Sequence, residues 1–153
     1  MRSETRAAAL VLAGSAALLG GAYAFELIGG LAPCEMCWWQ RYALMITAGL
    51  ALLALLVRRA PANWLAILAL AVNGGIAAFH AGVEQKWWQG LTRCTAPPLA
   101  GDAKSMLADI LAQPLVRCDA IAWQMFGISM AGWNFLVTLM LVGVATWLML
   151  KPR

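Results

Sequence analysis

The chain alternates between four long apolar stretches and shorter segments that carry its charged residues. The stretches without an acidic or basic residue are Ala7–Phe25, Tyr42–Val57, Ala60–Val83 and Ala120–Leu150. Because about 20 apolar residues cross the hydrocarbon core of a membrane as a helix, each stretch is long enough for one span. The pattern predicts an all-α membrane protein, a single domain (residues 1–153) built as a bundle of four transmembrane helices. We place the spans at about 7–27, 38–57, 62–82 and 128–150.

Composition supports a membrane location and excludes a soluble domain. Hydrophobic residues make up 63% of the chain and charged residues only 12%, whereas a soluble domain has about 25% charged residues. The net charge of +4 is spread along the sequence and forms no dense basic patch. We therefore expect a lipid bilayer around the protein and no nucleic-acid partner.

The first apolar stretch has a second interpretation. Arg2 and Arg6, the apolar run and the triplet Ala22-Tyr23-Ala24 together resemble a secretory signal peptide with its cleavage site. We interpret the stretch as a retained span, because its run is longer than that of a usual signal peptide and leads through a short hairpin to a pair of cysteines. A mature chain that begins at Phe25 would contradict this interpretation.

The basic residues indicate how the spans are oriented. The two chain ends and the short second connection hold six of them in very short segments, with Glu4 as the one acid: Arg2, Arg6, Arg58, Arg59, Lys151 and Arg153. The opposite side spreads five over longer segments that also hold six acids. The positive-inside tendency therefore places both ends of the chain in the cytoplasm. Segments 28–37 and 83–127, with all four cysteines, then face the periplasm, and the tryptophans near the span ends form an aromatic belt.

The long outer segment predicts a short helix between flexible connections. Residues 104–113 place Met106, Leu107, Ile110 and Leu111 on one face, which is typical of an amphipathic helix lying flat on the membrane surface. Prolines and a glycine flank this helix. Cys94 and Cys118 are therefore expected on irregular segments.

The other two cysteines form a CxxC motif at the predicted start of the second span. The thiolate is the reactive form of cysteine, and a helix N-terminus favours it. If the helix begins near Cys34, then Cys34, Cys37 and Arg41 share one face. We consider two interpretations of Arg41: an anchor at the membrane interface, or a binding group for an electron-rich acceptor beside Cys37.

The four cysteines have two other interpretations besides redox chemistry, a zinc site and structural disulfides, and the single histidine also has two. A zinc site usually needs two clustered pairs, whereas Cys94 and Cys118 lie 24 positions apart, so we expect no metal. Two structural disulfides are the other alternative. His80, near the outer end of the third span, has Glu84 at i+4, so it either hydrogen-bonds that carboxylate or donates to a bound cofactor.

The whole chain resembles the DsbB family of disulfide bond formation proteins. The specific features are the segment Pro33-Cys34-Glu35-Met36-Cys37-Trp38-Trp39-Gln40-Arg41-Tyr42, the pair Cys94 and Cys118, and Trp123, Gly127 and Trp133. A CxxC motif alone is weak evidence. It becomes specific with an arginine four positions after its second cysteine and a second cysteine pair between the third and fourth spans.

The resemblance implies a quinone-dependent protein-disulfide oxidoreductase. Cys94 would form the mixed disulfide with a reduced periplasmic DsbA-like protein, with Cys118 as its partner in the loop. Cys34 would exchange with Cys118, and Cys37 would pass electrons to a membrane quinone, ubiquinone or menaquinone. Arg41 would lie beside the quinone ring, and His80 matches the family's quinone-proximal histidine only approximately.

Two other functions are compatible with a membrane protein of this composition. An outward-directed thiol reductase needs cysteines within its spans to carry electrons across, and none lies in the middle of a span here. A membrane scaffold with structural disulfides needs no reactive thiol, so its disulfides should resist mild reductant.

Overall fold

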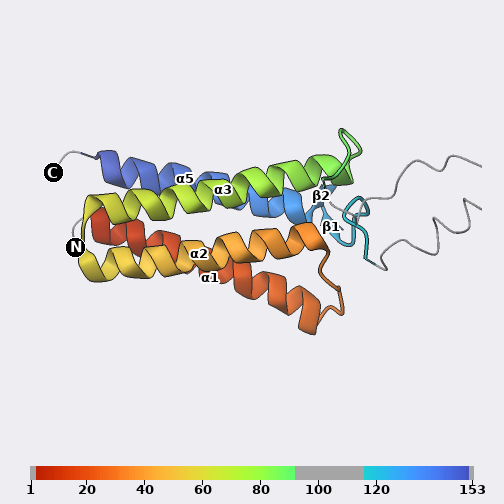
Figure 1. Cartoon of the computed structure of the whole chain (residues 1–153), viewed down its shortest axis with the longest axis horizontal. Helices are drawn as coiled ribbons and strands as arrows, with labels where there is room; N and C mark the ends of the chain where they lie inside the picture. The colour runs from red at the N-terminus through yellow and green to blue at the C-terminus, as the bar shows by residue number, and fades with distance from the viewer. Residues whose placement is uncertain (1–2, 92–115, 152–153) are drawn as a thin grey trace, which may run out of the picture.

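The computed structural model describes residues 3–91 and 116–151. Its helices are α1 (Ser3–Leu27), α2 (Glu35–Val57), α3 (Ala60–Glu84) and α5 (Met130–Leu150), and a two-stranded hairpin of β1 (Gln124–Met125) and β2 (Ile128–Ser129) precedes α5. All four helices are long and apolar enough to cross a membrane. They run side by side in a bundle, with both chain ends at one end and the hairpin at the other (Figure 1). The chain is therefore an α-helical membrane protein, as the apolar stretches predict.

Local sequence explains where the helices begin and end. The side chain of Cys34 caps α2 by accepting a hydrogen bond from the backbone N–H of Cys37, and Ser129 caps α5 in the same way through Gly132. Arg58 closes α2 in a left-handed conformation, and Pro61 stands in the first turn of α3. This two-residue connection, Arg58 and Arg59, makes α2 and α3 antiparallel neighbours.

The hairpin is an element that the hydropathy pattern does not predict. Gln124 pairs with Ser129 and Met125 with Ile128, while Phe126 and Gly127 both have positive φ. Two positive φ values in a two-residue loop are typical of the turns that match strand twist. The last helix consequently begins at Met130, two residues after the position expected from hydropathy. The expected surface helix at residues 104–113 lies outside the described residues.

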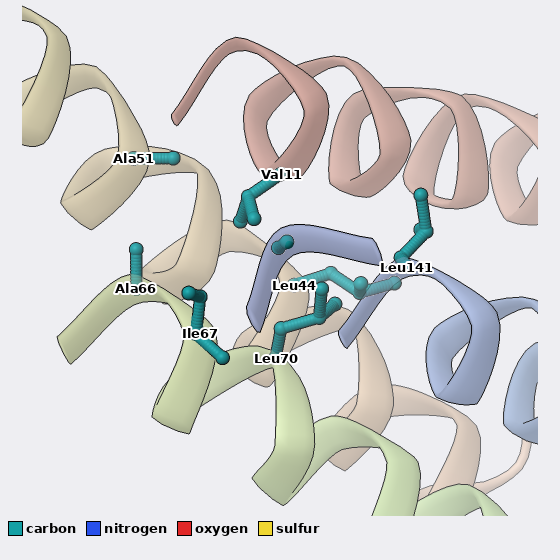
Figure 2. Close-up of a cluster of buried hydrophobic side chains, with 8 residues drawn as sticks. Val11, Leu44, Ala51, Ala66, Ile67, Leu70 and Leu141 are labelled. Atoms are coloured by element: carbon teal, nitrogen blue, oxygen red, sulfur yellow. The ribbon is translucent and has the colours of Figure 1, made fainter. Parts of the chain in front are cut away.

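Alanines and larger aliphatic side chains pack together in the half of the bundle near the chain ends. Its core consists of Val11, Leu44, Ala51, Ala66, Ile67, Leu70, Leu141 and Ala145, and Figure 2 shows the labelled members pointing toward one another from all four helices. The alanines let the helix backbones approach closely, as is usual between membrane helices. Large apolar side chains such as Leu56, Leu68 and Met140 are exposed on the outside, where lipid replaces water.

Candidate functional site

A cavity opens between the helices at the end of the bundle opposite the chain termini. Its volume is about 270 Å³, and residues from all four helices line it. Most of the lining is apolar, with alanines, leucines, Phe25 and Trp123 among the contributors. The polar exceptions include both cysteines of the CxxC motif together with Gln40, Arg41 and His80. The cavity therefore gathers the redox motif and the cation expected beside it, in apolar surroundings that suit a flat, uncharged ligand.

Cys34 and Cys37 lie at the N-terminus of α2, and their sulfurs are in contact. Both are free, and the thiol of Cys34 donates to the sulfur of Cys37 across 2.9 Å. The backbone N–H of Cys37 donates to the Cys34 sulfur at 3.2 Å. The hydrogen bond to Cys37, together with burial, raises the pKa of the Cys34 thiol. The contact between the two sulfurs therefore favours the thiol form of Cys34.

Cys118 lies next to the CxxC motif. It is disulfide-bonded and fully buried, and it belongs to the same buried cluster as Cys34, Met36 and Val83. The structure thus brings Cys34, Cys37 and Cys118 together. Cys94 lies outside the described residues.

An ion-pair cluster holds the Cys118 segment against the end of α3. The Lys86 ammonium donates to the Asp119 carboxylate at 2.7 Å, and the Arg117 guanidinium donates to both of its oxygens at 2.9 and 2.7 Å. These hydrogen bonds, that of Arg117 foremost, hold the pKa of Asp119 well below its usual range. The sequence alone gives no sign of this cluster, because Lys86 and Asp119 lie 33 positions apart.

Arg41 is buried and directed toward α1. It forms an ion pair with Glu26 and donates to the backbone carbonyl of Ala22 at 3.1 Å. Its guanidinium also stacks on the rings of Tyr23 and Trp38, with centroid distances of 4.5 and 5.0 Å. Among the described residues no group accepts a hydrogen bond from its Nε atom. Arg41 is thus an interior cation at the cavity wall with an unused donor.

His80 contacts the CxxC motif more closely than it contacts Glu84. Its Nδ1 lies 2.8 Å from the Gln40 amide nitrogen, and its Nε2 lies 3.6 Å from the Cys34 sulfur. The distance from Nε2 to the Glu84 carboxylate is 3.9 Å, which exceeds that of a hydrogen bond. The sequence reasoning missed Gln40 and Glu26 as members of the site. Their signal was the presence of polar side chains within or beside apolar spans.

Three ligand atoms at the site could hold a thiophilic metal ion. The sulfurs of Cys34 and Cys37 and a ring nitrogen of His80 all lie within 4.8 Å of one another. Two thiolates and an imidazole form a ligand set that zinc accepts. The same geometry serves thiol chemistry without a metal, since it places a hydrogen-bonding ring beside a cysteine pair.

The comparisons with known proteins point to one family. Residues 4–148 match the family model described as "Disulfide bond formation protein DsbB". A protein of Aromatoleum aromaticum named "Disulfide bond formation protein B" is 37% identical over 90% of this chain and 87% of its own.

Two further proteins with that name are similar over comparable lengths. The one from Verminephrobacter eiseniae is 34% identical, covering 88% of this chain and 80% of its own. The one from Marinobacter nauticus is 30% identical, covering 93% and 89%. No solved structure matches the chain. The chain is a multi-pass membrane protein with a CxxC motif at the start of its second helix, and the family model matches nearly its whole length. It belongs to the DsbB family of disulfide bond formation proteins.

Proposed function

We propose that this protein oxidises the thiols of a periplasmic DsbA-like protein and passes the electrons to a membrane quinone. One observation carries the proposal: Cys34 and Cys37 are free thiols in the wall of an apolar cavity that Arg41 also lines. Family membership supports disulfide oxidoreductase activity. The cavity, which residues of all four helices line, would give an acceptor dissolved in the membrane a binding place beside the thiols.

The residues present fit a quinone head group. The cavity wall is mainly apolar, which suits a planar ring, and the buried Arg41 has an Nε–H with no acceptor among the described residues. A quinone supplies an acceptor for two electrons and two protons and leaves as the quinol. Arg41 would hold a carbonyl oxygen of the ring, and His80, which also lines the cavity, would offer a second polar contact. Whether ubiquinone or menaquinone is used depends on ring substituents that the cavity must accommodate.

The cysteines divide into a pair that meets the protein partner and a pair that meets the acceptor. The partner's dithiol would exchange with a disulfide between Cys94 and Cys118, Cys94 forming the mixed disulfide, so that the partner leaves oxidised and the loop pair reduced. The Cys118 thiol would then attack Cys34 of a Cys34–Cys37 disulfide, and the Cys94 thiol would displace Cys34 from Cys118. This returns the loop pair to a disulfide and leaves Cys34 and Cys37 as thiols. Their re-oxidation to a disulfide releases two electrons and two protons to the quinone. The burial of Cys118 against Cys34 supports the middle exchange.

A reconstituted assay tests this function. Purified protein in lipid vesicles that contain ubiquinone or menaquinone receives a reduced DsbA-like protein, and both partner oxidation and quinone reduction are followed. We expect one quinone reduced for each partner dithiol oxidised. Repeated turnover of the partner without quinone, beyond the single exchange that the protein's own disulfides allow, or quinone reduction without partner, would contradict the proposed coupling. Cys94→Ser should abolish the adduct with the partner, whereas Cys118→Ser should trap it.

The proposal includes an orientation of the chain in the inner membrane. Both ends would lie in the cytoplasm, and residues 28–37 and 83–127 in the periplasm, following the distribution of basic residues. A membrane-impermeant thiol reagent applied to intact spheroplasts checks it on single cysteines introduced at the half-buried Ala60 and at the exposed Gln89. The Gln89→Cys variant should be labelled, and the Ala60→Cys variant should be labelled only after the membrane is opened.

A further inference from the structure

A series of hydrogen-bonded amide side chains from α3, α5 and α2 leads to His80. Asn73 is fully buried and Asn134 is half-buried, and the Asn73 amide donates to the Asn134 oxygen at 3.1 Å. The Asn134 amide donates to the Gln40 oxygen at 2.6 Å, and the Gln40 nitrogen lies 2.8 Å from His80 Nδ1. Gly74 permits this approach of α3 to α5, since a Cβ there would lie 2.9 Å from a methyl group of Thr138. Polar groups at this depth are costly, so a connected set of them indicates a role.

Gln40 and Asn134 each have one orientation that satisfies their neighbours. The backbone carbonyl of Met36 only accepts, and it lies 3.5 Å from the Gln40 nitrogen, so the NH₂ group of Gln40 is on the side of Met36 and His80. The Gln40 oxygen therefore faces Asn134. The Asn134 oxygen in turn accepts from Asn73 and from the Thr138 hydroxyl, at 3.1 and 3.3 Å, which directs its NH₂ group toward Gln40.

The direction of the hydrogen bonds along these amides determines which nitrogen of His80 carries the proton. Because Gln40 donates, Nδ1 must accept, and a neutral imidazole then has its proton on Nε2. Nε2 is the atom that faces the Cys34 sulfur at 3.6 Å. The other groups around the ring are the Glu84 carboxylate, 3.9 Å from Nε2, and the backbone of Cys118, which is a further hydrogen-bond partner.

We propose that Gln40 and Asn134 are positioning residues that hold His80 as an N–H donor to the sulfur of Cys34. In this arrangement the ring offers a hydrogen bond to Cys34 whenever its sulfur departs as a thiolate, and no proton needs to be transferred. The opposite tautomer would direct a lone pair at the sulfur and would leave the thiolate without this donor. The inference deepens the proposed function, on which it rests for the role of Cys34 as an exchanging thiol.

The single histidine of the chain makes the tautomer measurable. We would label the imidazole of the full-length protein in lipid with ¹⁵N and record its nitrogen resonances by NMR near neutral pH. The expected spectrum has a protonated Nε2 and an unprotonated Nδ1 whose shift shows an accepted hydrogen bond. In Gln40→Met, which keeps the side-chain length but has no donor, the Nδ1 resonance should move to that of a nitrogen without a donor. Asn134→Leu should move it in the same direction by less.

A matched control separates positioning from general perturbation. Asn63 is another buried asparagine of α3, and its amide donates to the Arg59 carbonyl at the far end of the helix. Asn63→Ala should leave both nitrogen resonances of His80 where they are. A protonated Nδ1 in the unaltered protein, or an Nδ1 resonance that Gln40→Met does not move, would overturn the inference.

A second readout follows the sulfur itself. In the protein with Cys34 and Cys37 reduced, mass mapping after brief alkylation gives the rate at each cysteine. Gln40→Met should slow the alkylation of Cys34 by about threefold, the size expected for the loss of a weak net hydrogen bond, and should change that of Cys37 less. Equal slowing at both would count against the inference. Neither readout involves quinone or partner, so a failed quinone assay with the expected tautomer would refute only the proposed function.

Discussion

The two halves of the bundle are built on different principles. The half near the chain ends is closed by aliphatic side chains, with Ala51, Ala66 and Leu70 fully buried. The half near the hairpin buries Gln40, Arg41, His80 and Glu84 in the same bundle. Packing alone would favour aliphatic residues throughout, because each polar group in a membrane interior must find a partner. The contrast supports the proposal that the polar half carries the chemistry and that the apolar half holds the bundle together.

The largest effect is expected from removing the acceptor-side thiol of the polar half. Cys37→Ser deletes the sulfur that receives the Cys34 hydrogen bond, so the CxxC disulfide can no longer form. Quinone reduction should fall by about a thousandfold or more, to the level without enzyme, while the protein still elutes as a folded species. Turnover within tenfold of that of the unaltered protein would contradict the proposed division of roles between the two cysteine pairs. Met36→Leu is a control that changes the intervening residue and keeps both sulfurs.

The apolar half should respond in stability and leave the chemistry intact. Leu70 is fully buried in the aliphatic core, and Leu70→Ala creates a cavity that should lower the free energy of unfolding by about 2–5 kcal/mol. Leu68→Ala, on the same helix but largely exposed toward lipid, should cost much less. Unfolding in mixed detergents compares the two variants. A larger effect on the quinone KM than on stability would contradict the proposed separation of the halves.

Arg41 offers a way to sharpen the comparison within the polar half. Arg41→Ala removes a cation at the cavity wall and should raise the apparent quinone KM about tenfold to a hundredfold, the range for a lost hydrogen bond to a charged group. Exchange with the DsbA-like partner, measured without quinone, should change less. Arg41→Lys should recover only part, because a lysine cannot donate to Glu26 and stack between Tyr23 and Trp38 in the same way. Equal losses in both reactions would contradict an acceptor-side role, and Arg59→Ala is the control.

The smallest effect concerns the ion-pair cluster beside Cys118. Asp119 has a lower pKa in the folded protein than its unfolded value of about 3.9. Its contribution to stability is therefore fully present above the unfolded value and is lost as the pH falls toward the folded one. Hydrogen exchange at residues 116–119 should stay constant between pH 7 and 5 after correction for intrinsic rates. Asp119→Asn should speed exchange severalfold throughout this range, and a pH-dependent difference within it would contradict the assigned pKa direction.

The sequence predicts the bundle well because the signals are additive along each segment. Four charge-free stretches are sufficient to indicate four apolar helices, and Pro33 before Cys34 is sufficient to indicate a helix start near the CxxC motif. The site is less accessible, since it depends on pairs that lie far apart in sequence. The Cys34–His80 contact joins positions 46 apart, and the link from Gln40 to Asn134 joins positions 94 apart. The hairpin at residues 124–129 gave no separate signal because these residues carry no charge and continue directly into the last apolar stretch.

The connection of Arg58 and Arg59 sets the register between α2 and α3, and so determines which of their residues meet at the cysteine end of the bundle. α2 and α3 have nearly equal lengths, 23 and 25 residues, so a turn at one end of the bundle fixes which residues meet at the other. One residue inserted in that turn would advance α3 by about 1.5 Å and rotate it by about 100° relative to α2. His80 would then no longer face Cys34, although the turn lies a whole membrane thickness away. The spacing of this remote connection is consequently as strict a requirement for thiol chemistry as the spacing within the CxxC motif itself.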